Sequence, residues 1–416
     1  MLIAGRVGTA DPLRAWRTNS PPADWYRRLK VFLGSGLAHG LWLEERRASV
    51  RTVLIAGGGI AGLTCAINLV ARGIPVEVHE AKRYCGKAIR DFEFLENWSF
   101  PEDALETVRR CGLRPTFNHR PIHSFTAYSP SAREITVSAR APLMYRVRRG
   151  PVPGSIDEAL ERQAKDAGVT IHYASRLPEE QATVIAWGAR RPNLLVAGIE
   201  FGTPAEDSIE VLADDACAPQ FYAYRIVDGG RGVIVTASPT DPASGRCRLD
   251  RTVQRFQEVR AVPMTAIRRF GYGSALRVPS TAMRDGRLYV GEAAGFQDSL
   301  FAFGMRYAML SGYLAARALA EGEDYDRLWR DAFGHQLAVG ARNRRLYSLF
   351  GNPGYEAMIR IIGSRNPVVA RLRRGRDARE LLVHVYARRI PRIFQAATVL
   401  PRGILVVMGK SRLTLH

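Results

Sequence analysis

Lysine and cysteine are both scarce in this chain of 416 residues. Only five of the 60 Lys+Arg residues are lysines, so nearly all of the positive charge is carried by arginine. The five cysteines are odd in number and include no Cys-x-x-Cys pair, which argues against a disulfide framework or a zinc ribbon and favours a reducing compartment. His119 and His123 form an isolated His-x-x-x-His pattern without an acidic or thiol partner nearby, so we expect no metal site.

Long apolar runs are also rare. The one window of membrane-spanning length, residues 52–71, contains four glycines whose spacing has a better explanation as a nucleotide-binding turn. Arginine and aspartate interrupt the first 20 residues, which is unlike a signal peptide. We therefore expect no transmembrane helix, no signal peptide and a cytoplasmic location.

Positive charge is in excess, with a formal net charge of +20. Residues 331–416 contain 16 Lys+Arg against four Asp+Glu, so this basic, helical C-terminal region carries +12. Such a surface attracts polyanions at every physiological pH, because arginine does not titrate there. We expect this region to associate peripherally with an anionic membrane surface, with a merely solvated surface as the alternative. Nucleic acid is a less favoured partner, because the chain lacks repeated basic and aromatic stacking residues.

A glycine-rich turn follows the first strongly apolar run. Residues 53–56 are apolar, and the next six, Gly57–Gly62, satisfy Gly-x-Gly-x-x-Gly at the start of a helical pattern. In such a turn the first glycine permits the tight bend, Gly59 lets the backbone approach a pyrophosphate, and Gly62 brings helix and strand together. Glu80 lies 23 residues after Gly57, near the spacing of an acid that binds ribose hydroxyls.

A second segment favours FAD over NAD. Gly291 and Glu292 follow an apolar strand pattern at 288–290, and Gly304 opens a long helical pattern. An acid at that strand end can bind ribityl hydroxyls. The helix would direct its positive end toward the flavin edge that gains negative charge on reduction. We therefore expect FAD as the cofactor.

These residues resemble the flavoproteins with a para-hydroxybenzoate-hydroxylase-like fold, and among them the geranylgeranyl reductase-like branch. The resemblance rests on GGGIAGL with Glu80, on Glu96-Asn97-Trp98, on Ser155-Ile156-Asp157 and most specifically on residues 291–312, and it spans about residues 51–349. By resemblance, Glu292 holds the ribityl chain and the backbone of Gly304 and Met305 contacts the isoalloxazine. The cofactor-binding residues implied are Gly57, Gly59, Ile60, Ala61, Gly62, Glu80, Ala81, Gly291, Glu292, Gly304 and Met305.

The expected fold is α/β, with a Rossmann-like FAD-binding domain of the glutathione-reductase type, an antiparallel-sheet substrate domain and a C-terminal helical region. The first 50 residues form an N-terminal extension, with an amphipathic stretch at residues 25–33. The FAD-binding domain is assigned to 51–95, 150–196 and 275–330, the substrate domain to 96–149 and 197–274, and the basic helical region to 331–416. Strands are expected at 53–56, 75–78, 124–128, 135–138, 169–173, 183–187, 194–201, 221–227, 232–237 and 288–290, and helices at 60–72, 101–111, from 155 onward and 304–319.

The resemblance implies that hydride from flavin N5 reduces a carbon–carbon double bond of a small apolar substrate, isoprenoid-like or aromatic. A monooxygenase acting through a flavin C4a-hydroperoxide is the alternative within the same fold. A basic nucleic-acid-binding flavoprotein and a membrane-associated binding protein with structural FAD are alternatives from other classes. The candidate catalytic residues are Trp98, Tyr222 and Tyr224. No second dinucleotide turn is present, so NAD(P)H is expected as a transient electron donor in the same cleft, or another protein supplies the electrons.

Overall fold

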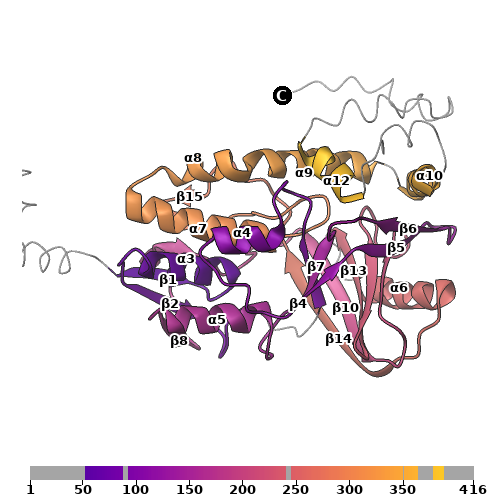
Figure 1. Ribbon diagram of the computed structural model, residues 1–416, viewed down its shortest axis with the longest axis horizontal. Coiled ribbons are helices and arrows are strands. Elements are labelled where there is room, and N and C mark those ends of the chain that lie inside the picture. Colours follow the sequence, from indigo (N-terminus) through magenta and orange to yellow (C-terminus); the bar gives the residue numbers. More distant parts are fainter. Residues whose placement is uncertain (1–51, 88–91, 240–244, 350, 364–377, 388–416) are drawn as a thin grey trace, which may run out of the picture. The chain divides into compact units, whose positions relative to one another are not determined.

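The computed structural model describes residues 52–87, 92–239, 245–349, 351–363 and 378–387 (Figure 1). The chain divides into two compact units at Thr52, and every helix and strand described below belongs to the second unit. The expected N-terminal extension, with its amphipathic stretch at 25–33, lies outside the described residues.

A six-stranded sheet contains the predicted glycine-turn unit. Its strand order is β15-β16-β9-β1-β2-β8, parallel throughout except for β15 at one edge. The strands are β1 (Val53–Ala56), β2 (Val76–Glu80), β8 (Thr170–Tyr173), β9 (Val184–Ile185), β15 (Met283–Arg284) and β16 (Arg287–Tyr289). Parallel strands need long crossovers, and helix α3 (Ile60–Val70) makes the connection from β1 to β2.

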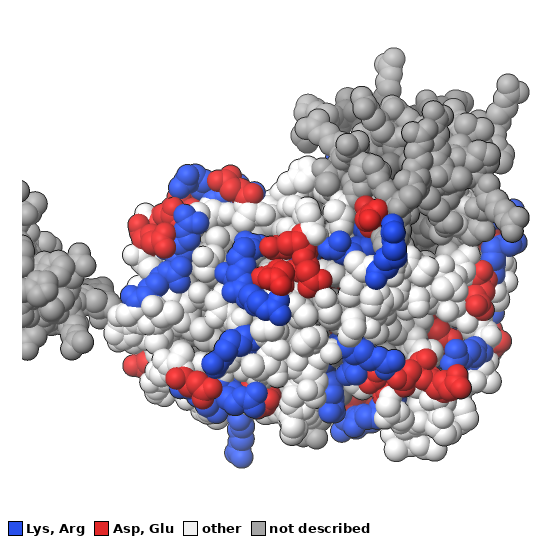
Figure 2. All heavy atoms as spheres, viewed as in Figure 1, with Lys and Arg blue, Asp and Glu red and all other residues white. Residues whose placement is uncertain are grey.

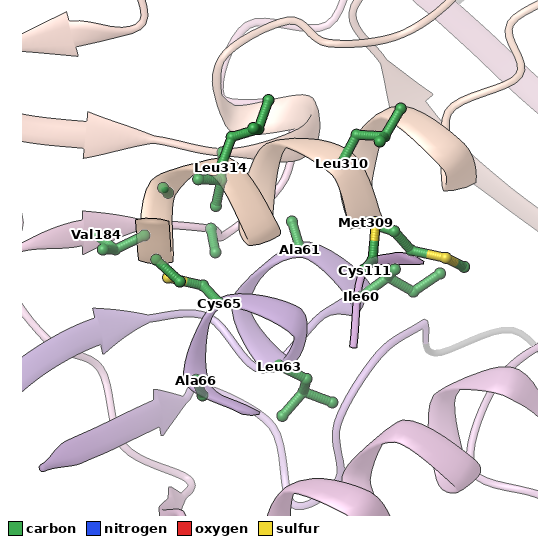
Figure 3. Packing of buried hydrophobic residues seen from close by; sticks show 14 of the residues in the cluster. Ile60, Ala61, Leu63, Cys65, Ala66, Cys111, Val184, Met309, Leu310 and Leu314 are labelled. Carbon is green, nitrogen blue, oxygen red and sulfur yellow. The ribbon is translucent and has the colours of Figure 1, made fainter. Parts of the chain in front are cut away.

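Helix α3 is buried almost along its whole length between β1, β2 and two other helices, α5 (Ile156–Asp166) and α7 (Met305–Glu321). Figure 3 shows α3 directly beneath α7, with Ala61 and Cys65 at the crossing. A Cβ at Gly312 of α7 would lie 2.3 Å from the Ala61 carbonyl oxygen, so only glycine permits this close approach. Helix α3, which follows the glycine turn, therefore packs tightly against α7, the helix that follows the second motif.

The rest of the body is largely antiparallel. A seven-stranded sheet has the order β14-β10-β13-β12-β11-β5-β6, with one parallel pair, β11 with β5, and α6 (Gly245–Val259) packs on it. A three-stranded antiparallel sheet has the order β3-β7-β4, and α4 (Ala104–Arg110) lies between β3 and β4 in the chain. The strands are β3 (Phe92–Glu96), β4 (His119–Ile122), β5 (Ser124–Tyr128), β6 (Glu134–Ser138), β7 (Met144–Arg148), β10 (Leu194–Gly202), β11 (Ser208–Leu212), β12 (Ala223–Asp228), β13 (Arg231–Pro239) and β14 (Thr265–Ser274).

After α7 the described chain is helical. It contains α8 (Tyr325–Trp329), one π-helical turn (Arg330–Gly334), α9 (His335–Ser348), α10 (Gly351–Gly363) and α12 (Ala378–Ala387). Both α10 and α12 contact β6, which brings them against the seven-stranded sheet. Within the described residues, no helix combines the length and apolar character needed to cross a membrane.

Charge on the described body is mixed. Figure 2 shows Lys and Arg side chains interspersed with Asp and Glu on the face in view. The segments outside the described residues contain 21 Lys+Arg against seven Asp+Glu, which is +14 of the total +20. Most of the positive excess therefore falls outside the described body, and membrane association of the basic region stays a prediction.

The predicted α/β fold class is confirmed. The boundaries of the expected strands differ from the observed ones by at most two residues; β9, for example, spans Val184–Ile185 where 183–187 was expected. The sequence analysis did not assign α6, although Leu249, Val253 and Phe256 lie at helical spacing and point to the sheet core.

Candidate functional site

The glycine turn between β1 and α3 is shaped by backbone contacts. Gly57 has φ +114°, and a Cβ there would lie 2.5 Å from the Ala186 carbonyl oxygen at the end of β9. A Cβ at Gly62 would lie 2.1 Å from the Gly57 oxygen, which explains why helix and turn can pack so closely. A Cβ at Gly59, in contrast, meets only the Ala186 oxygen, at 4.0 Å. Gly59 therefore faces open space, as expected of the point where a ligand approaches the backbone.

The N-terminus of α3 is open toward the same space. Gly59 is the N-cap residue, no side chain caps the helix, and no acidic residue lies in its first turn. The backbone N–H groups of a first turn are unpaired and carry partial positive charge. This end of α3 can therefore bind a phosphate.

Glu80, at the end of β2, is fixed by the turn that it faces. Its Oε2 accepts a hydrogen bond from the Gly58 N–H at 2.9 Å, and its Oε1 accepts one from the Lys82 N–H at 3.0 Å. The residue is buried. A carboxylate has about four lone pairs, so two acceptor positions remain for ribose hydroxyls. The turn and the acid thus form one rigid cradle.

Glu292 lies in a short 3₁₀ turn, η3 (Gly291–Ala293), just after β16. Its Oε1 lies 2.5 Å from the Ser274 hydroxyl and accepts a hydrogen bond from the Ala275 N–H at 3.2 Å. The turn itself is anchored to α7, because the Gly291 N–H donates to Ser311 Oγ at 2.9 Å. Strand β14 and helix α7 together hold the Glu292 carboxylate in one position.

Arg306, in the first turn of α7, pairs with Glu96 and not with Glu292. Its side chain is fully buried, with Nη1 3.4 Å from Glu96 Oε2 and Nη2 donating to Thr107 Oγ1 at 2.6 Å. Burial raises the pKa of Glu96 to about 7, although Arg306 opposes this rise. A cation at a helix N-terminus is unfavourable, and Glu96 offsets that cost.

A single cavity of about 1920 Å³ joins these elements. It exceeds the roughly 300–1,000 Å³ of pockets for drug-sized ligands, so it has room for a dinucleotide and a second molecule. The cofactor-binding residues implied by the sequence all line it, except Gly62, whose role is packing: Gly57, Gly59, Ile60, Ala61, Glu80, Ala81, Gly291, Glu292, Gly304 and Met305.

Aromatic side chains line one part of this cavity, the aromatic chamber. Trp98, Tyr222 and Tyr224 line it together with Phe301 and Phe303. The rings contact one another edge to face, with centroids 5.1 Å apart for Trp98 and Phe303 and 6.0 Å apart for Tyr222 and Phe301. The Tyr222 hydroxyl donates to the Phe301 carbonyl at 2.6 Å, and burial raises the pKa of Tyr222. Tyr222 thus holds the loop that carries Phe301.

A charged network at the cavity wall was missed by the sequence analysis. Glu93 pairs with Lys87 and Arg149, and Arg149 Nε also binds the buried Asp157 at 2.9 Å. Although burial opposes it, the two cations lower the pKa of Glu93 to about 2. The only hint of this network in the sequence was Asp157, which follows the helix-capping Ser155 by two residues. Its pairing with Arg149 is recognisable only in the folded chain.

The thiols contribute little to the site. Cys85, which the sequence placed just beyond Glu80, is buried, and burial raises its pKa. It does not line the cavity, whereas Lys87 does. Cys85 therefore acts as a small apolar residue beside the turn.

No family model and no curated protein matches the chain. Solved structures do match. A geranylgeranyl bacteriochlorophyll reductase-like protein from Thermoplasma acidophilum aligns with a TM-score of 0.64 at 16% identity, covering 84% of this chain and 100% of that one. The flavin-dependent brominase Bmp2 aligns with a TM-score of 0.56 at 17% identity, covering 84% and 98%. This chain has the para-hydroxybenzoate-hydroxylase-like flavoprotein fold.

A third protein with the same flavoprotein fold is a flavoprotein/dehydrogenase from Cytophaga hutchinsonii, with a TM-score of 0.51 at 13% identity, covering 81% of this chain and 98% of that one. At these identities the likeness concerns the fold. The fold implied by the resemblance recognised in the sequence is thereby confirmed. The three proteins are described as a reductase-like protein, a flavin-dependent brominase and a flavoprotein/dehydrogenase.

The residues present fit FAD. The open space at Gly59, the uncapped N-terminus of α3 and the fixed Glu80 carboxylate suit the ADP half. Glu292 suits the ribityl hydroxyls, and the N-terminus of α7, which has no side-chain cap and no acid in its first turn, suits the flavin end.

We expect a Glu292→Ala variant to bind FAD one to two orders of magnitude more weakly. Loss of a charge-assisted hydrogen bond costs about 1.5–3 kcal/mol, and each decade of affinity corresponds to about 1.4 kcal/mol. Titration of the flavin-free protein with FAD, followed by fluorescence quenching, measures the change. Glu292→Asp keeps the charge and should stay within severalfold of the wild type. Unchanged affinity in Glu292→Ala would remove Glu292 from the site.

Proposed function

We propose that this protein is an FAD-dependent oxidoreductase that reduces a carbon–carbon double bond in an apolar, isoprenoid-like or aromatic substrate. One observation carries the proposal: the glycine turn with Glu80 and the aromatic residues line the same cavity. Bound FAD would supply hydride chemistry at N5. The protein's contribution is to hold the substrate in a dry chamber next to it.

The chamber walls favour an apolar substrate. Beyond the aromatic residues, the cavity is lined by Met358, Ile359 and Ile362 of α10 and by Leu381 and Leu382 of α12. Apolar surface of this kind binds hydrocarbon by excluding water. An extended chain or a ring system fits such a lining better than a charged metabolite does.

Reduction of a double bond also needs a proton at the second carbon. The Tyr222 hydroxyl already donates to the Phe301 carbonyl, and its pKa is raised by burial, so it is a weak acid in this position. We infer that the proton reaches the substrate from Tyr224 or from water, and that Tyr222 acts by positioning the Phe301 loop. NAD(P)H bound transiently in the same cavity, or a protein donor, would reduce the flavin.

The second candidate is a flavin-dependent monooxygenase. It is favoured by the likeness in fold to the flavin-dependent brominase Bmp2. Both chemistries use reduced flavin and an enclosed apolar chamber. They differ in whether the reduced protein delivers its electrons to the substrate or to O₂.

A test of the two functions separates them by product mass. FAD-loaded protein is reduced under nitrogen and mixed with candidate isoprenoid and aromatic alkenes, first without and then with O₂. We expect flavin reoxidation by substrate under nitrogen and a product two hydrogens heavier. A product one oxygen heavier, formed only with O₂, would overturn the reductase assignment in favour of the monooxygenase. Gly59→Val, prepared in the same way, serves as the control that should show neither reaction.

A further inference from the structure

Three potential metal ligands lie together on the edge of the six-stranded sheet. Along β2, Val76, Val78 and Glu80 are buried, whereas Glu77 and His79 are half-buried. Alternate residues of a strand project to opposite faces, so Glu77 and His79 share the face opposite α3. Parallel pairing places His172 of β8 directly beside His79. The sheet thus brings together residues that are up to 95 positions apart.

The ligand atoms of these residues are already close. His172 Nε2 lies 2.9 Å from Glu77 Oε2, and the two imidazole rings stack with centroids 4.6 Å apart. One ligand atom from each of the three residues lies within 4.8 Å of the others. Metal–ligand bonds of about 2.0–2.2 Å place neighbouring zinc ligands roughly 3.3 Å apart. A small rotation of half-buried side chains is enough to reach that separation.

Ser175 prepares His79 for binding. His79 Nδ1 lies 2.9 Å from Ser175 Oγ, which occupies that nitrogen and leaves Nε2 as the ligand. Metal-binding histidines commonly have their second nitrogen fixed by such a partner.

We propose that Glu77, His79 and His172 bind a divalent transition-metal ion of the Zn²⁺ class, with water completing the coordination. Two imidazoles and one carboxylate form a ligand set that suits Zn²⁺ and leaves a position for water. The site is separate from the flavin chemistry, but His79 immediately precedes Glu80, and both residues line the nucleotide end of the cavity. Metal bound here would stand beside the cradle for the ADP half.

The test uses untagged full-length protein treated with EDTA and dialysed, with Zn²⁺ followed by calorimetry and Co²⁺ by its visible absorption. We expect saturable binding with one ion per chain. The variants Glu77→Gln and His79→Ala, and the double variant His79→Ala/His172→Ala, should each weaken binding at least about 10-fold, with the double variant weakest. Ser175→Ala should weaken it by a smaller factor, because it removes only the partner of Nδ1.

The matched control is His119→Ala/His123→Ala. It removes two histidines that lie only four positions apart in the sequence but are not part of the proposed site. It should bind metal like the wild type. X-ray absorption of the Zn²⁺-loaded wild type should give two imidazole ligands, a result that does not depend on how well any variant folds. No saturable binding by the wild type, equal binding by the His79/His172 double variant, or loss of binding in the His119/His123 control would each overturn the proposal.

Discussion

A Gly59→Val variant should fold and purify without flavin. Gly59 has φ −82° and ψ −179°, which valine can adopt, and a Cβ there meets only one atom, at 4.0 Å. The cost to the flavin-free fold is about 1 kcal/mol, for a less suitable N-cap residue. With FAD bound, the same side chain would occupy the space of the pyrophosphate. We expect FAD affinity to fall at least 100-fold, or about 2.8 kcal/mol.

Two further glycine variants make the comparison specific. Gly59→Ala adds a smaller side chain at the same point and should give an intermediate loss of FAD affinity. Gly62→Val forces a Cβ within 2.1 Å of the Gly57 oxygen, so it should damage the fold itself. Circular dichroism, thermal unfolding and FAD titration distinguish the two effects. A Gly59→Val protein that binds FAD as tightly as the wild type would show that the cofactor lies elsewhere.

An Arg306→Met variant should lose about 3–5 kcal/mol of stability, because it leaves the buried Glu96 carboxylate without its cation. The side chains of Arg306 and Glu96 are 0% and 2% exposed, so water cannot replace the missing partner. Arg327→Met is the matched control. The Arg327 side chain is 62% exposed and lies 4.0 Å from Glu323, and an ion pair of that kind contributes about 0–1 kcal/mol.

The loss of folding stability in Arg306→Met relative to the wild type, its stability deficit, should depend on pH. In the wild type, burial already raises the pKa of Glu96 to about 7, and removal of Arg306 raises it further. A carboxyl group whose pKa is higher in the folded than in the unfolded protein destabilises the fold as pH rises from its unfolded pKa toward its folded pKa. Below about pH 7 the wild type and the variant lose this stability alike, so the difference between them should stay constant from pH 5 to 6 and grow above about pH 7, by at most about 1.4 kcal/mol per pH unit.

Urea unfolding at pH 5, 6, 7 and 8 measures this trend for wild type, Arg306→Met and Arg327→Met. A deficit that does not change with pH would mean that Glu96 is not the group left uncompensated. A deficit equal to that of Arg327→Met would mean that the buried pair contributes no more than a surface pair.

The cofactor cradle was the most predictable part of the molecule, because its signals are local. The turn Gly57–Gly62 is contiguous in sequence, Glu80 ends the next strand, and Gly291, Glu292 and Gly304 lie within one segment. A strand, a tight turn and a helix follow directly from such patterns. The structure places all of these residues except Gly58 and Gly62 on the wall of one cavity.

The contacts between segments that are far apart in the chain could not be predicted from such local patterns. Arg306 and Glu96 are 210 residues apart, and only the contact of α7 with β3 brings them together. His79 and His172 meet through strand register, whereas the histidines that do share a short sequence motif, His119 and His123, belong to no cluster of potential ligands among the described residues. Charge pairs and ligand sets depend on which strands become neighbours, and sequence spacing does not record that.

The walls of the cavity come from different stretches of the chain. Residues of β1, α3 and β2 and of the N-terminus of α7 line it, and so do residues of α10 and α12, which follow both large sheets in the sequence. A change in Met358, Ile359 or Leu382 therefore alters the shape offered to a substrate without touching the glycine turn. Substitutions in this late helical segment can change substrate specificity while the cofactor-binding residues stay the same.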